Sequence, residues 1–241
     1  MIVLFTDFGL AGPYTGQMLA ALHREAPDVP AISLFADAPA GEPKPSAYLL
    51  AAYAAWFPPG TVFLAVIDPG VGSARRALIV EADERRYVGP DNGLFELVLR
   101  RAAASRVWEI TWQPPGLSAS FHGRDLFAPV AARLAAGTGP AGLARPLTPL
   151  REPGWPDDLA EIVYIDHYGN AMTGLRGGSV PPTARIGAPG RTIPPARTFS
   201  AAPEGTAFWY VNSNGLIEIA VNRGRAAETQ GLAVGTVVSV G

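Results

Sequence analysis

Cysteine is absent from the 241 residues of the chain. Its absence excludes disulfides, thiolate metal sites and cysteine nucleophiles, and it fits a reducing compartment. Charge is also scarce, because only 17% of the residues are charged, the formal net charge is −2 and Lys and Arg form no long run. A nucleic-acid-binding or membrane-surface protein needs a basic patch, so we expect neither kind of partner.

Long apolar runs are lacking as well. The longest, Tyr48–Phe57, stops at Pro58-Pro59-Gly60, whereas a membrane span needs about 20 apolar residues. The N-terminus reads MIVLFTDFG, without the basic region of a signal peptide. We therefore expect a cytoplasmic protein. Hydrophobic residues make up 48% of the chain, which is enough to fill a sizeable core.

Strand-like and helix-like segments alternate in the first half of the chain. Short apolar runs and amphipathic stretches of 10–15 residues are typical of a mostly parallel sheet covered by helices on both faces. We predict strands at Ile2–Phe5, Pro30–Phe35, Thr61–Ile67, Ala77–Glu81 and Arg86–Val88, and helices at Thr15–Glu25, Ser46–Phe57, Gly93–Ala103 and Arg124–Ala136.

The pattern changes near residue 150, where Leu150–Pro156 is typical of a linker. Beyond it lie short strand candidates and turn residues, with no convincing helix: Glu161–Ile165, Thr183–Ile186, Ala207–Val211, Leu216–Val221 and Val234–Val240. Asn212-Ser213-Asn214-Gly215 is a good hairpin turn between two of them. We predict an α/β domain over residues 1–150 and a smaller antiparallel β-barrel domain over residues 157–241.

Polar residues gather where the predicted strands end, which is where open α/β sheets bind ligands. They are Asp7, Asp68, Pro90–Gly93, Ser120–Asp125 and Asp166–Asn170. Taken singly, Asp-Pro-Gly and Asp-Asn-Gly are ordinary turns, Asp91 or Asn92 can cap a helix, and Arg75 beside Arg76 can be a solvated pair. Of the three histidines, His122 is the strongest candidate for a functional residue, because it lies in a polar stretch flanked by glycine. His167 is a weaker candidate, and His23 is predicted to lie on the surface of a helix.

Other chemistries find no support in the sequence. Gly137–Gly142 matches a dinucleotide fingerprint by letters, but it follows a helix and is better interpreted as a helix stop. No phosphate loop, no histidine pair with metal spacing and no nucleophile elbow occurs. We expect neither a metal nor a cofactor. From the residues alone, the chain is a two-domain small-molecule enzyme with a polar crevice.

Seven blocks of the sequence, in order, resemble the S-adenosyl-L-methionine (SAM) hydroxide adenosyltransferases, which are adenosine-forming SAM hydrolases related to fluorinating and chlorinating enzymes. The blocks are Thr6–Gly9 with Pro13-Tyr14, Val66–Gly72 with Arg75-Arg76, Gly89–Leu94, Phe121–Pro129, Ile165–Asn170, Asn212–Gly215 and Glu218–Asn222. The resemblance implies an N-terminal α/β domain, a C-terminal β-barrel and a homotrimer that holds SAM between the N-terminal domain of one chain and the C-terminal domain of its neighbour.

The resemblance also implies a role for particular residues. Asp68, Arg75 and His122 form the hydrolytic set. The substrate-binding residues are Asp7 for the ribose hydroxyls, Asn170, Tyr168, Phe199 and the Arg223 backbone for adenine, and Asp166, Ser213 and Tyr210 for the methionine end. Because a sulfonium is already an activated leaving group, such a site needs an aligned water rather than a general acid.

Two alternatives stay open: a module that binds SAM or adenosine without turnover, and a halide-dependent transferase. Binding alone does not need the Asp68–Arg75–His122 set. Halogenases typically carry tyrosine at the Asp68 position, and a carboxylate beside the 5′-carbon repels halide. One segment departs from the family pattern, because Ser33-Leu34-Phe35-Ala36 lacks the usual histidine motif and Gly41–Pro45 is unusual. The resemblance therefore predicts the reaction type more firmly than the substrate range.

Overall fold

The computed structural model describes residues 1–148, 152 and 154–241. The chain divides into two compact units, one of Met1–Ala51 with Phe57–Glu152 and one of Ala52–Trp56 with Pro153–Gly241. The predicted domain boundary at residue 150 lies outside the described residues, as does part of the predicted linker Leu150–Pro156.

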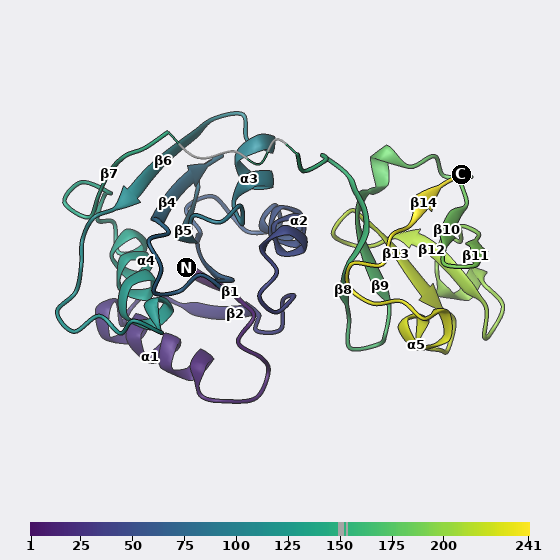
Figure 1. Ribbon diagram of the computed structural model, residues 1–241, viewed down its shortest axis with the longest axis horizontal. Helices are drawn as coiled ribbons and strands as arrows, with labels where there is room; N and C mark the ends of the chain where they lie inside the picture. The colour runs from purple at the N-terminus through teal and green to yellow at the C-terminus, as the bar shows by residue number, and fades with distance from the viewer. Residues whose placement is uncertain (149–151, 153) are drawn as a thin grey trace. The chain divides into compact units, whose positions relative to one another are not determined.

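The first unit is built on one seven-stranded sheet in the order β2-β1-β3-β5-β4-β6-β7 (Figure 1). The strands are β1 Ile2–Thr6, β2 Ala31–Phe35, β3 Val62–Val66, β4 Ala77–Ala82, β5 Arg85–Pro90, β6 Ser105–Ile110 and β7 Ala144–Pro146. The helices are α1 Tyr14–Glu25, α2 Pro43–Ala54, α3 Glu96–Arg101, the π-helix Gly123–Phe127 and α4 Ala128–Ala135.

The central strands are parallel, because β1 pairs in parallel with β2 and β3, and β3 with β5. Strand β4 returns antiparallel to both β5 and β6. Every residue of β1 and β3 is buried, as expected for strands covered on both faces. All carboxyl ends of β1, β3 and β5 therefore meet at one edge of the sheet.

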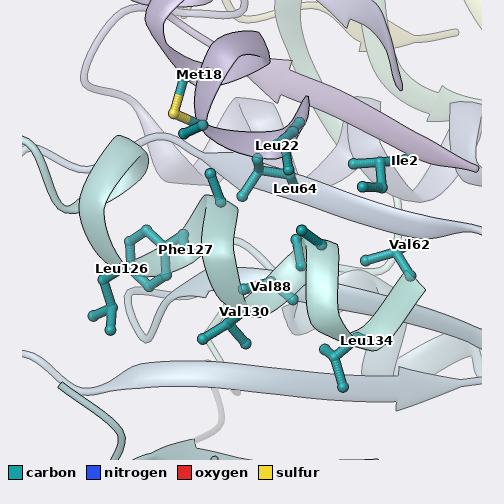
Figure 2. Packing of buried hydrophobic residues seen from close by; sticks show 14 of the residues in the cluster. Ile2, Met18, Leu22, Val62, Leu64, Val88, Leu126, Phe127, Val130 and Leu134 are labelled. Carbon is teal, nitrogen blue, oxygen red and sulfur yellow. The ribbon is translucent and has the colours of Figure 1, made fainter. Parts of the chain in front are cut away.

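Helices α1 and α4 cover one face of this sheet. Ile2, Leu4, Val62 and Leu64 alternate along β1 and β3 toward that face and pack with residues of both helices. Figure 2 shows Leu126, Phe127, Val130 and Leu134 next to Met18, Leu22 and the strand residues Ile2, Val62 and Leu64. The buried cluster holds the start of α4, and with it the segment that carries His122, against the sheet.

The opposite face is packed with aromatic rings. Phe63 stacks on Tyr87 with ring centroids 5.0 Å apart, and Tyr87 contacts Phe95 directly before α3. Phe57 meets Phe63 edge-on at 5.3 Å. Both faces of the sheet are thus covered, as the alternating pattern predicts.

The second unit contains two antiparallel sheets. A four-stranded sheet has the order β12-β13-β9-β8, and a three-stranded sheet has the order β11-β10-β14. The strands are β8 Leu159–Ile165, β9 Ala171–Arg176, β10 Ile186–Ala188, β11 Arg191–Ile193, β12 Ala207–Val211, β13 Leu216–Val221 and β14 Ser239–Val240. The predicted mixed fold, a helix-flanked sheet followed by antiparallel strands, is confirmed; closure of those strands into a barrel stays a prediction.

Several local predictions are wrong. Strands β6, β7, β9 and β11 were not predicted, and the short helix α5 Ala226–Gln230 lies where we predict none. The predicted helix over residues 124–136 begins instead as a π-helix, in which the Ala128 N–H donates to the Gly123 carbonyl. Pro129 has no N–H to donate to residue 125, which removes an α-helical bond at this turn. No helix among the described residues is long and apolar enough to cross a membrane.

Candidate active site

Adjacent parallel strands bring two carboxylates to the same edge of the sheet. Asp7 directly follows β1, and Asp68 follows β3 by two residues. Thr6 is paired in register with Val66, so the two strands end side by side. Because the next residues leave the sheet here, their side chains face the carboxyl-end crevice where open α/β sheets bind ligands.

Asp68 and Arg75 form a bidentate ion pair. Arg75 Nε donates to Asp68 Oδ1 at 2.8 Å, and Arg75 Nη2 donates to Asp68 Oδ2 at 2.5 Å. The side chains are only 5% and 10% exposed. Arg75 also lies over the Phe127 ring, 5.1 Å from its centroid. A shielded fork of this kind holds both groups in one geometry and is not a solvated surface pair.

His122 joins this pair through Arg75, whose Nη2 lies 3.0 Å from His122 Nδ1. A guanidinium can only donate, so Nδ1 accepts and the ring proton is on Nε2. Burial lowers the pKa of His122, and the positive charge of Arg75 lowers it further, against smaller opposing effects of Asp68 and Asp125. His122 is therefore a neutral imidazole that offers an Nε2–H donor near neutral pH.

Close backbone packing joins the loop that carries Asp68 and Arg75 to the loop that carries His122. Gly72 has φ +80°, and a Cβ there would lie 2.6 Å from the Ala119 carbonyl oxygen. Gly123 is crowded by Met18 and Phe121, which a Cβ would meet at 3.2 and 3.3 Å. Only glycine permits this approach at residue 72, and it brings together groups that are 47 residues apart.

Asp7 is held by the segment that departs from the family pattern. Its Oδ2 accepts a hydrogen bond from the Gly41 N–H at 2.8 Å. Burial raises the pKa of Asp7, and the charge of Asp68 adds to that effect. Gly41, at φ +68°, thus supplies a backbone donor to the carboxylate, a contact that no sequence motif indicates.

A cavity of about 140 Å³ lies at this edge of the first unit. Asp7, Asp68 and His122 line it together with Phe8, Gly41, Val66, Pro69, Val71, Ser120, Phe121 and Gly123. Asp7, Asp68 and His122 are therefore brought to one cavity, and Arg75 bonds to both Asp68 and His122.

A larger cavity of about 890 Å³ lies in the second unit. Its lining includes all seven residues predicted to bind substrate there: Asp166, Tyr168, Asn170, Phe199, Tyr210, Ser213 and Arg223. His167 also lines it, whereas His23 is exposed on α1. Tyr168 is 72% exposed and Phe199 38% exposed, so two aromatic faces are available at its surface.

Asp166 and Asn170 are bonded to each other across the turn between β8 and β9. The backbone N–H of Asn170 donates to Asp166 Oδ1 at 2.8 Å, and its side-chain Nδ2 donates to Asp166 Oδ2 at 3.0 Å. The two residues are thus fixed as a unit, with the amide nitrogen of Asn170 directed toward the carboxylate.

Glu218 lines the same cavity and was not predicted as a site residue. It is 2% exposed, accepts from the Tyr210 hydroxyl at 2.5 Å and accepts from Asn212 Nδ2 at 2.8 Å. Burial raises its pKa, and the Asp166 charge contributes in the same direction. Glu218 lies within the otherwise apolar strand β13. A single carboxylate in an apolar run is the feature of the sequence that could have identified it as a site residue.

The described residues contain no group of three or more His, Asp or Glu side chains that could hold a metal ion.

Comparisons with known proteins match most of the chain. The SAM hydroxide adenosyltransferase N-terminal domain matches residues 2–144, and the C-terminal domain of the same family matches residues 160–239. The chain is 38% identical over 253 residues to the (R)-S-adenosyl-L-methionine hydrolase of Thermus thermophilus, covering 97% of this chain and 96% of that one. It is 40% identical over 239 residues to the hydrolase of the same name from Salinispora arenicola, covering 92% and 90%.

Two solved structures share the fold over the whole length. A conserved protein of Thermotoga maritima superimposes with a TM-score of 0.89 at 28% identity and covers 100% of both chains. A conserved protein of Thermus thermophilus gives a TM-score of 0.79 at 38% identity and covers 99% of this chain and 98% of that one. With both family domains matched in order, the chain belongs to the SAM hydroxide adenosyltransferase family.

Proposed function

We propose that this chain hydrolyses S-adenosyl-L-methionine to adenosine and L-methionine, with water as the nucleophile. The relatives at 38–40% identity carry the name of this activity. The observation that carries the proposal is the shielded Asp68–Arg75–His122 cluster, because a module that only binds SAM does not need it.

At the ribose 5′-carbon, the reaction forms one bond and breaks one. The water oxygen attacks the ribose 5′-carbon opposite to sulfur, and the C5′–S bond breaks with its electron pair leaving on sulfur. The positive sulfonium becomes the neutral thioether of methionine, and the water loses a proton. Holding the water in line with the C–S bond can supply up to about 10 kcal/mol of the barrier.

Each of the three residues of the cluster interacts with that water in a different way. Asp68 accepts a hydrogen bond from it and takes or orients its proton. Arg75 stabilises developing hydroxide character, since its side chain is only 10% exposed and charge acts strongly where water is excluded. His122 donates from Nε2 to hold the water oxygen, a role that fits its neutral tautomer.

Substrate binding uses polar groups for the sugar and aromatic faces for the base. Asp7 accepts from the ribose hydroxyls, since a carboxylate suits a diol. Tyr168 and Phe199 lie against adenine, Asn170 reads its edge, and Arg223, at φ 55°, offers backbone groups.

The methionine end meets carboxylates and hydroxyls. Asp166 and Ser213 were expected there from the family resemblance, with Tyr210 beside them. We add Glu218, whose buried carboxylate is oriented by Tyr210 and Asn212. Two acidic groups match the ammonium of the amino acid, and Ser213 can donate to its carboxylate.

We also propose that the chain forms the homotrimer that the family resemblance implies, with SAM held between the first unit of one copy and the second unit of its neighbour. Light scattering of the purified protein is expected to give three times the chain mass of 25.3 kDa. A monomer at working concentration that still forms adenosine would contradict the trimer and leave the reaction proposal intact.

Incubation of the purified protein with SAM, followed by chromatography, tests the reaction. Adenosine and methionine are expected to appear without added halide or metal, and the R epimer named for the relatives is expected to react faster than the S epimer. Asp68→Asn and His122→Ala are expected to lower kcat far more than they raise KM. SAM binding by the wild type without any adenosine would favour the binding module, and a requirement for halide would favour the halogenase.

A further inference from the structure

The turn that follows β5 contains two polar side chains that the proposed mechanism does not use, Asp91 and Asn92. Turn formation or helix capping would account for each of them singly. Asn92 Oδ1 does accept from the Leu94 N–H at 3.3 Å, as a local turn requires. The remaining contacts of both side chains, however, lead away from the turn and toward the hydrolytic set.

Asn92 is bonded to the backbone directly before Asp68. Its Nδ2 donates to the Ile67 carbonyl at 2.8 Å, across 25 residues of sequence. Because Leu94 occupies Oδ1, the amide orientation is fixed and only Nδ2 can face Ile67. The peptide that carries Asp68 is thereby tied to the turn.

Asp91 is bonded to the residue directly after Arg75. Arg76 Nε donates to Asp91 Oδ2 at 2.7 Å, and the two side chains are 28% and 8% exposed. The Asp91 N–H also donates to the Arg76 carbonyl at 3.0 Å. Asp91 therefore holds Arg76 by both its side chain and its backbone.

Arg75 completes the connection, because its Nη1 donates to the same Arg76 carbonyl at 3.3 Å. One guanidinium thus bonds to Asp68, to His122 and to the carbonyl that Asp91 anchors.

We propose that Asp91 and Asn92 are positioning residues for hydrolysis, which hold the backbones of Arg75 and Asp68 so that the ion pair meets His122 at the water site. The inference rests on the proposed function of that set. The turn acts through Ile67 and Arg76 and does not touch the substrate. Loss of either anchor shifts a hydrolytic group, and a displacement of about 1 Å can cost about 100-fold in rate.

The test compares kcat and KM of Asp91→Asn and Asn92→Asp with those of the wild type. Asn92→Asp keeps the shape but places an acceptor against the Ile67 carbonyl. We expect kcat to fall about tenfold to 100-fold in each variant, with KM within about threefold of the wild type. If Asp91→Asn does not fold, Asn92→Asp carries the test, since it leaves the ion pair with Arg76 intact.

Glu96→Gln is the matched control, because it breaks another shielded ion pair of the same unit. Glu96 bonds to Arg100 at 2.8 Å with side chains 2% and 22% exposed, and its other oxygen accepts from the Glu152 N–H. It is expected to lower Tm as much as Asp91→Asn does, while kcat stays within about twofold of the wild type. A double variant of Asp91→Asn with Arg76→Gln is expected to be no slower than the slower single variant, since both changes cut one connection.

Wild-type protein and Asp68→Asn are assayed alongside. If the wild type is active, Asp68→Asn is slow, and both turn variants retain the wild-type kcat despite a lower Tm, the turn is merely structural and the positioning role is overturned. If the wild type forms no adenosine, the proposed function is overturned, and the inference that rests on it falls too.

Discussion

Replacement of Gly72 by alanine perturbs the contact between the two loops of the hydrolytic set. The added Cβ would lie 2.6 Å from the Ala119 carbonyl oxygen, about 0.8 Å short of the 3.4 Å at which ordinary contact begins. The atom it meets belongs to the backbone and cannot rotate away as a flexible side-chain end can. Ala119 or Gly72 must therefore move, and Ala119 is three residues from His122.

The size of the effect follows from these distances. A displacement of several tenths of an ångström at His122 or Arg75 is expected to lower kcat about tenfold to 100-fold, since 1 Å can cost about 100-fold. The left-handed backbone of Gly72, at φ +80°, adds roughly 1–2 kcal/mol of destabilisation for a residue with a Cβ. Crowding of the carbonyl adds about 1–3 kcal/mol more.

Gly60→Ala is the control that separates backbone strain from displacement of the site. Gly60 has φ +82°, and a Cβ added there would meet no atom within 4 Å, so the variant carries the same strain without the clash. The assay measures adenosine formation at saturating SAM together with thermal unfolding. Gly60→Ala is expected to lose about 1–2 kcal/mol of stability and to keep its kcat.

Equal kcat values for Gly72→Ala and Gly60→Ala would refute the reasoning. That result would mean that contact between the two loops does not set the position of His122 relative to Arg75. A rise in KM with unchanged kcat in Gly72→Ala would likewise place its effect on binding and not on the hydrolytic set.

Three further outcomes are expected. Burial and Arg75 lower the pKa of His122 below its usual 6.5, so kcat is expected to stay constant as pH falls to 6.5 and to decline only at lower pH. Arg75→Gln is expected to raise the pKa of His122, measured by NMR titration of the ring. An unchanged pKa in that variant would contradict the contact between Arg75 and His122. Burial raises the pKa of Glu218 above 4.5, so its carboxylate protonates at higher pH than an exposed glutamate, and KM is expected to rise on mild acidification. Glu218→Gln is expected to raise KM about tenfold or more at neutral pH and to remove this pH dependence. An unchanged KM in that variant would exclude Glu218 from ammonium binding. Gly89→Ala is expected to prevent folding of the first unit, since its Cβ would lie 2.0 Å from the Ala65 carbonyl oxygen, and a Tm close to the wild type in calorimetry would contradict this packing.

The elements that are predictable from sequence are those with a local physical signal. Strands β12 and β13 and the turn between them match the prediction, because short apolar runs flank Asn212–Gly215 and residues 212 and 216 then pair. Strand β9 was missed because Gly174 and Thr173 weaken its pattern. Packing against strand β8 requires glycine at residue 174, since a Cβ there would lie 2.6 Å from Leu159 Cβ.

The candidate site is predictable only in part. Asp68 and Arg75 are 7 residues apart, but the contact of Arg75 with His122 spans 47 residues, so local spacing cannot reveal it. The family resemblance selected these residues, and the structure brings them within hydrogen-bonding distance. Glu218 and the Gly41 contact to Asp7 were missed, since the first lies inside a strand and the second uses a backbone N–H.

The central claim is that water attacks the ribose 5′-carbon at the Asp68–Arg75–His122 cluster. Turnover of SAM in ¹⁸O-labelled water, with mass spectrometry of both products, tests it most directly. We expect one ¹⁸O atom in the 5′-hydroxyl of adenosine, unlabelled methionine, and loss of this product in Asp68→Asn. Adenosine without label, or label in methionine, would contradict attack by water at that carbon.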